Sequence, residues 1–323
     1  MLKSLKCYFM GQHMFYGEPE GTGFETIDPR FKDCLIGHAR VERLWTGGRW
    51  LEGPAWFPAG RYFICSDIPN NRMLRFDECD GNVSVFRQPS FNSNGNTVDT
   101  KGRLYTCEHL ARRVSRTNFD GSIAVIADKY MGKRLNSPND LVVKSDGSIW
   151  FTDPPYGILY DYEGGRAEPE IGANNVYRVD GQTGEIEIVA DDFDKPNGIA
   201  FSPDENFLYI ADTGASHKDG GNRHIRRFAV GGDGKTLGAS EVFAECTAGL
   251  FDGFRPDSDG RLWTSAADGV HCYDPDGTLI GKIRIPELVS NVCFGGAQLN
   301  RLFICGTTSM YSAFLAVNGS KPR

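Results

Sequence analysis

The sequence has 323 residues, of which 40% are hydrophobic and 24% charged, and its formal net charge is −7. This acidic balance argues against nucleic-acid binding, which needs a basic face, and no apolar run reaches the roughly 18–20 residues of a membrane span. The nine cysteines are scattered without a Cys-x-x-Cys pair, which favours reduced thiols in a cytoplasmic protein over a disulfide framework.

The N-terminal region precedes any repeated pattern. Residues 1–15 contain two lysines but no sustained apolar core and no small-residue cleavage site, so we expect no signal peptide. We predict that residues 1–38 form an arm packed on the outside of the protein. The next segment, ARVERLWTG at 39–47, is typical of a single strand. No composition break follows it, which predicts one domain over residues 39–323.

Six segments then share one plan: a short apolar strand, a polar turn, and an aromatic or β-branched strand. The plan is plainest in SPNDLVVKSDGSIWFTDPPYG at 137–157 and in KPNGIAFSPDENFLYIADTG at 195–214. The other four segments lie at 53–67, 96–109, 252–268 and 291–308. Turns such as KSDG and PDEN favour hairpins, because Asp, Asn and Gly tolerate positive φ.

The residue that ends the second strand recurs at intervals typical of four-stranded propeller blades. These residues are Asp67, Glu108, Asp153, Asp212, Ala267 and Thr307. Further strand pairs, such as VYRVD followed by IEIVAD, come after most of them, and no long helical period intervenes. The sequence therefore predicts an all-β fold, a six-bladed β-propeller around a central channel, in which residues 39–47 supply the outer strand that closes the ring.

A polar residue opens the first strand of every repeat. The six residues are Glu52, Asn96, Asn139, Asn197, Asp252 and Asn291. Since the first strand of each blade lines the channel, these side chains should converge at one end of it. A single Asn or Asp before a strand is typical of a turn. Six polar residues at the same position of the repeat instead predict a bound ligand, because a ring of amides and acids would lack hydrogen-bond partners without one.

The chemistry of this column indicates which ion it would bind. Two carboxylates with amides, and no imidazole or thiolate, suit Ca²⁺, Mg²⁺ or Mn²⁺ better than Zn²⁺. Ca²⁺ is our first expectation, with Mg²⁺, Mn²⁺ and Zn²⁺ as alternatives. The sequence has no His-Glu-x-x-His, Gly-x-Ser-x-Gly or Walker motif, which argues against serine-nucleophile and nucleotide enzymes.

Two loops on the expected ligand face are unusually long, at 154–175 and 213–224. Long loops are often functional lids, and the alternative is a solvated insertion without contact to the site. Tyr156 in the first loop and His109, next to the second anchor, are predicted substrate contacts. An ordinary packed or surface imidazole is the alternative for His109. The other predicted substrate contacts are Asn96, Asn139 and Asn291.

Several of these motifs resemble the SMP-30/gluconolactonase/LRE-like family over residues 24–318. They are LEGPAWF, SPNDLVV with SIWFTDPPYG, KPNGIAFSPDENFLYIADT and DGFRPDSDGRLW, and FETIDPRF at 24–31 is similar to the bacterial gluconolactonase branch. The resemblance implies a six-bladed propeller with one catalytic divalent ion, commonly Ca²⁺. By motif, it implies that Glu52, Asn197 and Asp252 bind this ion, and that Asn139 binds the ion, substrate or water.

One departure from the family pattern concerns the sugar. The animal members use an Arg-x-Asn-Asp motif for sugar contact, and here the corresponding residues are Ser137, Pro138, Asn139 and Asp140. The arginine contact is therefore absent, which leaves the sugar preference open.

The sequence thus predicts a metal-dependent hydrolase that opens a small sugar lactone such as glucono-1,5-lactone, with the ion stabilising the oxyanion and Asp252 as general base. A cation-bound carboxylate is a weak base. Three roles for Asp252 therefore stay open: a loosely bound base, a nucleophile, or a ligand of the ion only. The alternatives are a phosphotriesterase-type or other lactone hydrolase on the same site, or a non-catalytic calcium-binding propeller. We expect no nucleic-acid or membrane partner, and a monomer or homodimer.

Overall fold

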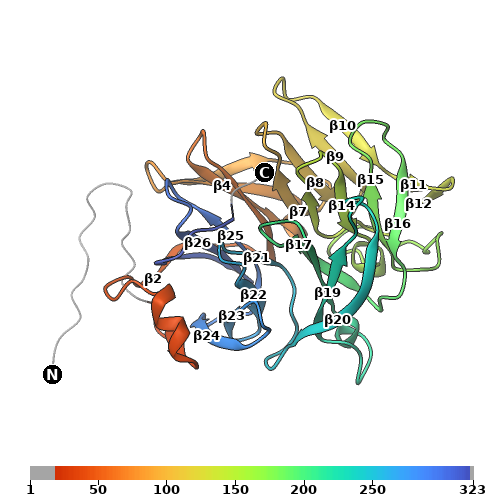
Figure 1. The fold of residues 1–323 in the computed structure, drawn as a ribbon. Helices are drawn as coiled ribbons and strands as arrows, with labels where there is room; N and C mark the ends of the chain where they lie inside the picture. The colour runs from red at the N-terminus through yellow and green to blue at the C-terminus, as the bar shows by residue number, and fades with distance from the viewer. Residues whose placement is uncertain (1–18, 321–323) are drawn as a thin grey trace.

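The computed structural model describes residues 19–320, which form six antiparallel sheets arranged in a ring (Figure 1). Five sheets have four strands, and the sixth has a fifth strand added at its edge. This arrangement confirms the predicted six-bladed β-propeller. Residues 1–18 of the predicted N-terminal arm lie outside the described part of the chain.

Each blade is a short meander, and the strands are as follows. Blade 1 has β3 (Leu51–Phe57), β4 (Tyr62–Asp67), β5 (Arg72–Asp77) and β6 (Val83–Arg87). Blade 2 has β7 (Ser93–Val98), β8 (Leu104–Glu108), β9 (Arg113–Thr117) and β10 (Ile123–Ala127). Blade 3 has β13 (Leu141–Val143), β14 (Ile149–Thr152), β15 (Val176–Val179) and β16 (Ile186–Ala190).

The second half of the chain repeats this plan. Blade 4 has β17 (Pro196–Phe201), β18 (Phe207–Asp212), β19 (His224–Val230) and β20 (Leu237–Glu245). Blade 5 has β21 (Phe254–Pro256), β22 (Leu262–Ala266), β23 (Gly269–Tyr273) and β24 (Leu279–Arg284), with β1 (Gly23–Thr26) at its edge. Blade 6 has β25 (Val289–Gly295), β26 (Arg301–Gly306), β27 (Ser309–Phe314) and, from the N-terminal side, β2 (Val41–Thr46).

The remaining elements are short. A two-stranded ribbon consists of β11 (Lys129–Tyr130) and β12 (Lys133–Arg134), and the helical turns are α1 (Tyr156–Leu159), η1 (Pro29–Cys34), η2 (Ile68–Asn70) and η3 (Gly214–Ser216). Within residues 19–320, no helix has the length and apolar character needed to cross a membrane.

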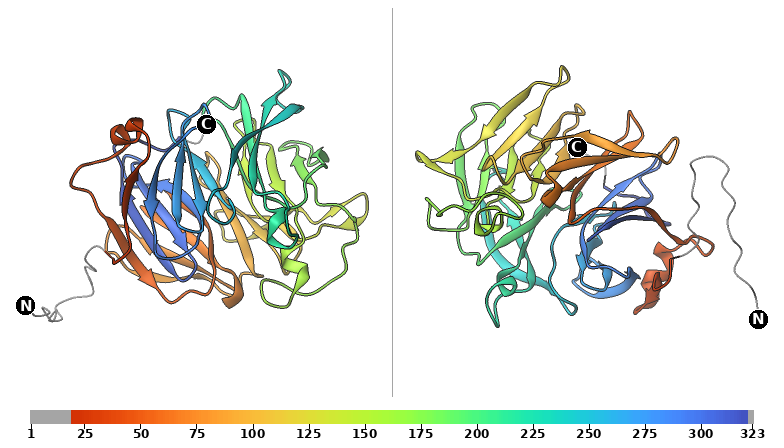
Figure 2. Two further views of the ribbon diagram at one scale, coloured as in Figure 1. Left: turned by 90° about the horizontal axis from the view of Figure 1, so that it is seen from below. Right: turned by 180° about the vertical axis from the view of Figure 1, so that it is seen from behind.

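The ring closes between the two ends of the chain. β2 pairs antiparallel with β27, from Val41 opposite Ala313 to Thr46 opposite Ser309, so that red and blue segments lie side by side in both views of Figure 2. The inner strands contact one another in sequence around the channel, β3 with β7, then β13, β17, β21, β25 and β3 again. Since every blade begins with its inner strand, all six inner strands begin at the same end of the channel.

The hydrophobic core is divided among the six blade interfaces. Between blades 6 and 1, Trp56 stacks on Phe303 with ring centroids 5.4 Å apart, and Phe63 stacks on the same ring at 4.6 Å. Between blades 3 and 4, Trp150 meets Phe201 edge-on at 5.3 Å. Apolar residues alternate along the strands and interdigitate between neighbouring sheets, as expected for face-to-face sheets.

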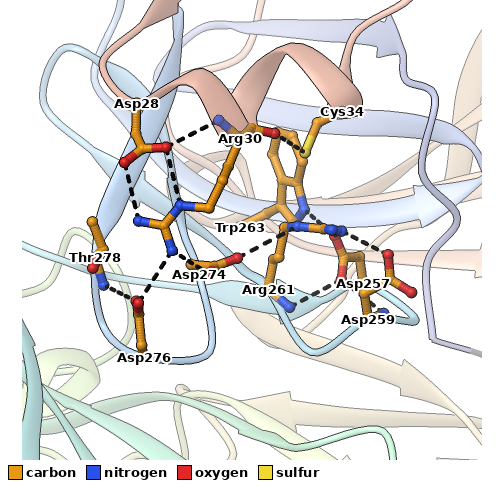
Figure 3. Close-up of polar contacts among 10 residues, drawn as sticks. All are labelled: Asp28, Arg30, Cys34, Asp257, Asp259, Arg261, Trp263, Asp274, Asp276 and Thr278. Carbon is orange, nitrogen blue, oxygen red and sulfur yellow. Dashed lines mark hydrogen bonds and ion pairs between the residues drawn. The ribbon is translucent and has the colours of Figure 1, made fainter.

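The described part of the predicted arm lies against blade 5. β1 pairs with β24, and Phe31 in η1 is fully buried against Trp263, with ring centroids 5.9 Å apart. Arg30 joins the two segments by ion pairs of 2.6 Å to Asp274 and 3.1 Å to Asp276, as Figure 3 shows. The arm therefore covers the outer edge of blade 5, away from the channel.

Candidate active site

Five of the six predicted column residues lie where the inner strands begin. Glu52 is in β3, Asn197 in β17 and Asn291 in β25. Asn139 and Asp252 stand two residues before the first residues of the short strands β13 and β21. Four of these side chains are almost fully buried and Asp252 is half-buried. The structure therefore brings together the residues that the sequence pattern placed at one end of the channel.

The structure corrects one member of this column. β7 begins at Ser93, and its register against β8 shifts between Ser93 and Asn96. Asn94 stands in the position equivalent to Glu52, because Ser93 pairs with the anchor Glu108 as Leu51 pairs with Asp67. Asn96 lies two residues further along. Its amide nitrogen donates to the carbonyl of Gly53 at 2.9 Å, and its oxygen accepts from the Thr106 hydroxyl at 2.9 Å.

Glycine follows four of the six column residues, and close packing of the ring explains it. A Cβ at Gly198 would lie 2.1 Å from the carbonyl oxygen of Asp252, and one at Gly53 would lie 2.1 Å from the carbonyl oxygen of Asn94. Both distances are far below van der Waals contact, so only glycine lets neighbouring inner strands approach this closely. The dipeptide Asn94-Gly95 repeats this pattern and is the sequence signal for Asn94.

Acidic residues that end the second strands hold the segments that lead into the inner strands. Asp153 accepts 2.8 Å hydrogen bonds from the backbone N–H groups of Asn136 and Ser137. Asp67 accepts one of 3.0 Å from the backbone of Arg49. Since both carboxylates are fully buried, these charge-assisted bonds fix where each inner strand starts. The repeated acid is thus a positioning group for the polar residue two or three positions further on.

The carboxyl groups of Glu52 and Asp252 lie near each other and are both shielded from solvent. Burial and the charge of Asp140 raise the pKa of Glu52, although its carboxylate accepts from the Asn291 amide at 3.0 Å and from the backbone of Gly53. Burial and the charge of Glu52 raise the pKa of Asp252 well above its ordinary value, against a hydrogen bond from Asn197. Crowded carboxylates of this kind are stabilised by a cation, which removes their repulsion.

An ion pair across the channel supplies part of the missing positive charge. Nη1 of Arg255, in β21, lies 3.4 Å from Oδ2 of Asp140, which directly precedes β13. Blades 5 and 3 are not neighbours, so this pair spans the channel. With Glu52 and Asp252 ionised, the four charged groups would sum to −2. A single divalent cation would balance that charge.

The donor set fits a hard divalent cation. Asn197 Oδ1 is buried and has no hydrogen-bond partner among residues 19–320. The side chain of Asn139 likewise makes no hydrogen bond in the described part of the chain, which leaves its amide oxygen free. No three His, Cys, Asp or Glu side chains in these residues form a metal cluster. The candidate ligands are therefore two carboxylates and amide oxygens, which suit Ca²⁺ or Mg²⁺.

The other predicted site residues lie around this centre. Asn291 is occupied on both sides, since its amide donates to Glu52 and its oxygen accepts from the backbone N–H of Val292 at 2.8 Å. It therefore holds Glu52 in place. His109 is fully buried beside Asn94, with 3.3 Å between Nε2 and the Asn94 amide nitrogen.

The two long loops meet at Tyr156. Its hydroxyl lies 2.6 Å from the Thr213 hydroxyl and 2.9 Å from that of Ser216. Burial raises the pKa of Tyr156 to about 12, and the charge of Asp252 adds to this shift. Loops 154–175 and 213–224 thus touch each other close to Asp252, which places them on the face of the channel that the sequence predicted.

Comparison with known proteins identifies the family of this chain. The family model described as the SMP-30/gluconolactonase/LRE-like region matches residues 50–308. The chain is 32% identical to a gluconolactonase of Zymomonas mobilis over 83% of its own length and 80% of the relative's.

A pentonolactonase of Haloferax volcanii is 29% identical over 80% of this chain and 82% of its own. The solved structure of a gluconolactonase from Xanthomonas campestris is 39% identical and superimposes with a TM-score of 0.84, covering 92% of this chain and 95% of that one. The chain belongs to the SMP-30/gluconolactonase/LRE-like family.

Proposed function

We propose that this protein is a lactone hydrolase that acts on a sugar lactone such as glucono-1,5-lactone and requires a divalent cation, with Ca²⁺ as the first candidate. The observation that carries the proposal is the ring of Glu52, Asn139, Asn197 and Asp252 at one end of the channel, with a buried amide oxygen left without a partner. The gluconolactonase and pentonolactonase relatives support the substrate class.

These four residues would hold the cation. A divalent cation bound among them would polarise a carbonyl oxygen and stabilise negative charge that develops on it. Glu52 is suited to be a fixed ligand, because Asn291 and the Gly53 backbone orient its carboxylate. Asn197 is suited in the same way, since its amide nitrogen is engaged by Asp252 and its oxygen is left free.

Asp252 is the acid placed to react. It is half-buried whereas Glu52 is 3% exposed. It also lies near the long loop, where its charge helps to raise the pKa of Tyr156 and the charge of Glu163 helps to raise its own. We propose that Asp252 accepts a proton from the water that attacks the lactone carbonyl carbon. The ring C–O bond then breaks, its oxygen takes up a proton, and the product is an open hydroxy acid.

The polarity of the site favours a hydroxylated substrate. The ring residues and the hydroxyls of Tyr156, Thr213 and Ser216 offer hydrogen bonds near the reacting acid. Ser137, which stands where animal members have the sugar-contacting arginine, has its hydroxyl bonded to the carbonyl of Pro154 at 2.7 Å. It therefore holds the base of the long loop, and the sugar contacts must come from other residues.

A pH-stat assay tests this proposal. Chelated protein would be given glucono-1,5-lactone, with Ca²⁺, Mg²⁺, Mn²⁺ or Zn²⁺ restored in turn, beside Asp252→Asn and Glu52→Gln. We expect acid release that depends on the cation. Asp252→Asn should lose turnover while it stays folded, and Glu52→Gln should mainly weaken cation binding. Absence of acid release with every cation, in protein that still binds one, would refute the lactonase assignment and turn attention to phosphotriesters.

A further inference from the structure

A chain of hydrogen bonds stands behind Asn94, the blade 2 member of the ring. His109 Nδ1 lies 3.0 Å from the backbone carbonyl oxygen of Glu163, in the loop at 154–175. His109 Nε2 lies 3.3 Å from the Asn94 side-chain nitrogen. His109 is fully buried and Asn94 is 4% exposed, while Glu163 is partly exposed. The imidazole therefore joins the long loop to the ring.

The chemistry of this chain fixes the direction of each bond. A carbonyl oxygen can only accept, so His109 Nδ1 must carry the proton. The side-chain nitrogen of Asn94 faces His109 Nε2 and can only donate, so Nε2 accepts through its lone pair and carries no proton. The consequence is that the Asn94 amide oxygen is turned away from His109.

That oxygen has no other partner. Asn94 is 4% exposed, and its Oδ1 is buried without a hydrogen bond from any residue between 19 and 320. Asn197 Oδ1, which belongs to another blade of the ring, is likewise buried without a hydrogen bond among these residues. Buried amide oxygens are nearly always satisfied in native proteins. An acceptor held in this orientation therefore indicates a positively charged or hydrogen-donating group in front of it.

The neighbours of Asn94 indicate which group this is. Asn94 stands in the ring between Glu52-Gly53 and Asn139, whose carbonyl accepts from Gly95 N–H at 2.8 Å. Both neighbours are candidate cation ligands. Because its oxygen is shielded from solvent, a small ion can reach it more readily than a sugar ring. This favours the cation over a substrate hydroxyl.

We propose that Asn94 presents its amide oxygen to the same divalent cation as Glu52, Asn139, Asn197 and Asp252, and that His109 is its positioning residue. The inference rests on the cation site of the proposed function but not on the lactone. Groups behind metal ligands orient them and often matter about tenfold or more in metal affinity. The backbone of Glu163 extends this support into the loop, where a Cβ at Gly157 would lie 2.5 Å from that of His109.

Cation binding by the full-length protein tests the proposal. Ca²⁺ affinity of chelator-stripped protein would be measured by titration calorimetry for wild type, Asn94→Ala, Asn94→Asp and His109→Phe, with the exposed His38→Phe as control. We expect Kd to rise about tenfold or more in Asn94→Ala and His109→Phe, with no change in the control. Asn94→Asp keeps an oxygen donor, so it should stay within about threefold of wild type.

Asn94→Asp also gives a readout that a merely structural role would not move. Its carboxylate can only accept, so His109 should gain a proton on Nε2, which ¹⁵N NMR of the metal-free protein detects and which wild type lacks. Wild-type Kd in folded Asn94→Ala, or in His109→Phe, would overturn the inference. Protein that binds Ca²⁺ as expected but opens no lactone would refute the proposed function alone, and wild type that binds no cation would refute both.

Discussion

The backbone N–H of Lys195, two residues before Asn197, donates a 2.9 Å hydrogen bond to the carboxylate of Asp212. The other carboxylate oxygen accepts from the Asp194 backbone at 3.0 Å, and the side chain is 1% exposed. Asp212→Ala would leave these amides buried without acceptors. We expect it to lower the free energy of unfolding by about 2–3 kcal/mol and to weaken Ca²⁺ binding, measured by urea denaturation and calorimetry.

A turn aspartate in the same blade gives the matched control for Asp212. Asp204 accepts from Ser202 and Asn206 in the hairpin between β17 and β18, at the opposite end of the blade from Asn197. Asp204→Ala should leave Ca²⁺ affinity unchanged whatever it does to stability. Equal weakening of Ca²⁺ binding by both variants would show that Asp212 does not act through the position of Asn197.

The ion pair between Arg255 and Asp140 makes stability depend on the cation. Arg255→Met leaves the Asp140 carboxylate, 2% exposed, without its partner near two other acids. We expect a loss of about 3 kcal/mol in metal-free protein and a smaller loss with saturating Ca²⁺, because the ion supplies the missing positive charge. Urea denaturation in chelator and in Ca²⁺ measures the two values.

Arg261 provides the comparison for Arg255. Both side chains are 19% exposed, but Arg261 pairs with Asp257 and Asp259 in the hairpin between β21 and β22, at the opposite end of blade 5 from Asp252 (Figure 3). Arg261→Met should therefore lose the same stability with and without Ca²⁺. If Arg255→Met also behaves in this way, the pair is structural only and has no electrostatic link to the cation site.

His109 predicts a pH dependence of stability. Burial lowers its pKa to about 4 from an ordinary value of 6.5, so between these values the unfolded chain binds more protons than the folded one. The contribution of His109 is fully present above pH 6.5 and is lost as pH falls toward 4. His109→Phe should therefore lose about 3 kcal/mol less stability than wild type over this range. Parallel stability curves for the two proteins would contradict the prediction.

Much of the fold could be predicted from the sequence, because hairpin turns and alternating strands are local patterns. The closing strand, β2, was also readable, since ARVERLWTG is a strand without a local partner. Asn94 was missed, although two local signals mark it: it precedes Gly95, and it lies 14 residues before the anchor Glu108, as Asn139 does before Asp153. Starting the repeat at Asn96 placed the polar residue two positions too far along β7, past the register shift near the start of this strand.

Contacts across the ring were not readable from the sequence. Arg255 and Asp140 are 115 residues apart and belong to blades that do not touch as sheets. Only the closed channel brings them together. The bond between Asn291 and Glu52, which joins the last and first blades, has the same origin. The sequence thus predicted the strands that line the channel and five of the six residues at their beginnings, and the ring determined which of these residues contact each other.

Gly198 tests the close approach of the inner strands. A Cβ there would lie 2.1 Å from the carbonyl oxygen of Asp252, whereas one at Gly232, between β19 and β20, would meet nothing within 4 Å. Gly198→Ala must push blade 5 away from blade 4. We expect it to lower the free energy of unfolding by about 3 kcal/mol and to weaken Ca²⁺ binding, and Gly232→Ala to change neither. Wild-type Ca²⁺ affinity in Gly198→Ala would show that the ring tolerates this displacement.

Tyr156 tests whether the two long loops act together on the substrate. Its hydroxyl is the bond between them, through Thr213 and Ser216, and its ring lies 5.5 Å from Lys195 Nζ. Tyr156→Phe removes the hydroxyl but keeps the ring, so stability should fall by only about 1 kcal/mol. With the loops no longer joined, we expect KM for glucono-1,5-lactone to rise several-fold while Ca²⁺ affinity stays at the wild-type value.

Tyr160, in the same loop and 63% exposed, is the control, since Tyr160→Phe removes a hydroxyl for which residues 19–320 provide no hydrogen bond. Equal KM values for the two variants would mean that the loops do not close over the site as one unit. A rise in KM for Tyr156→Phe alone, with unchanged cation binding, would place the loop contact on the substrate side of the site.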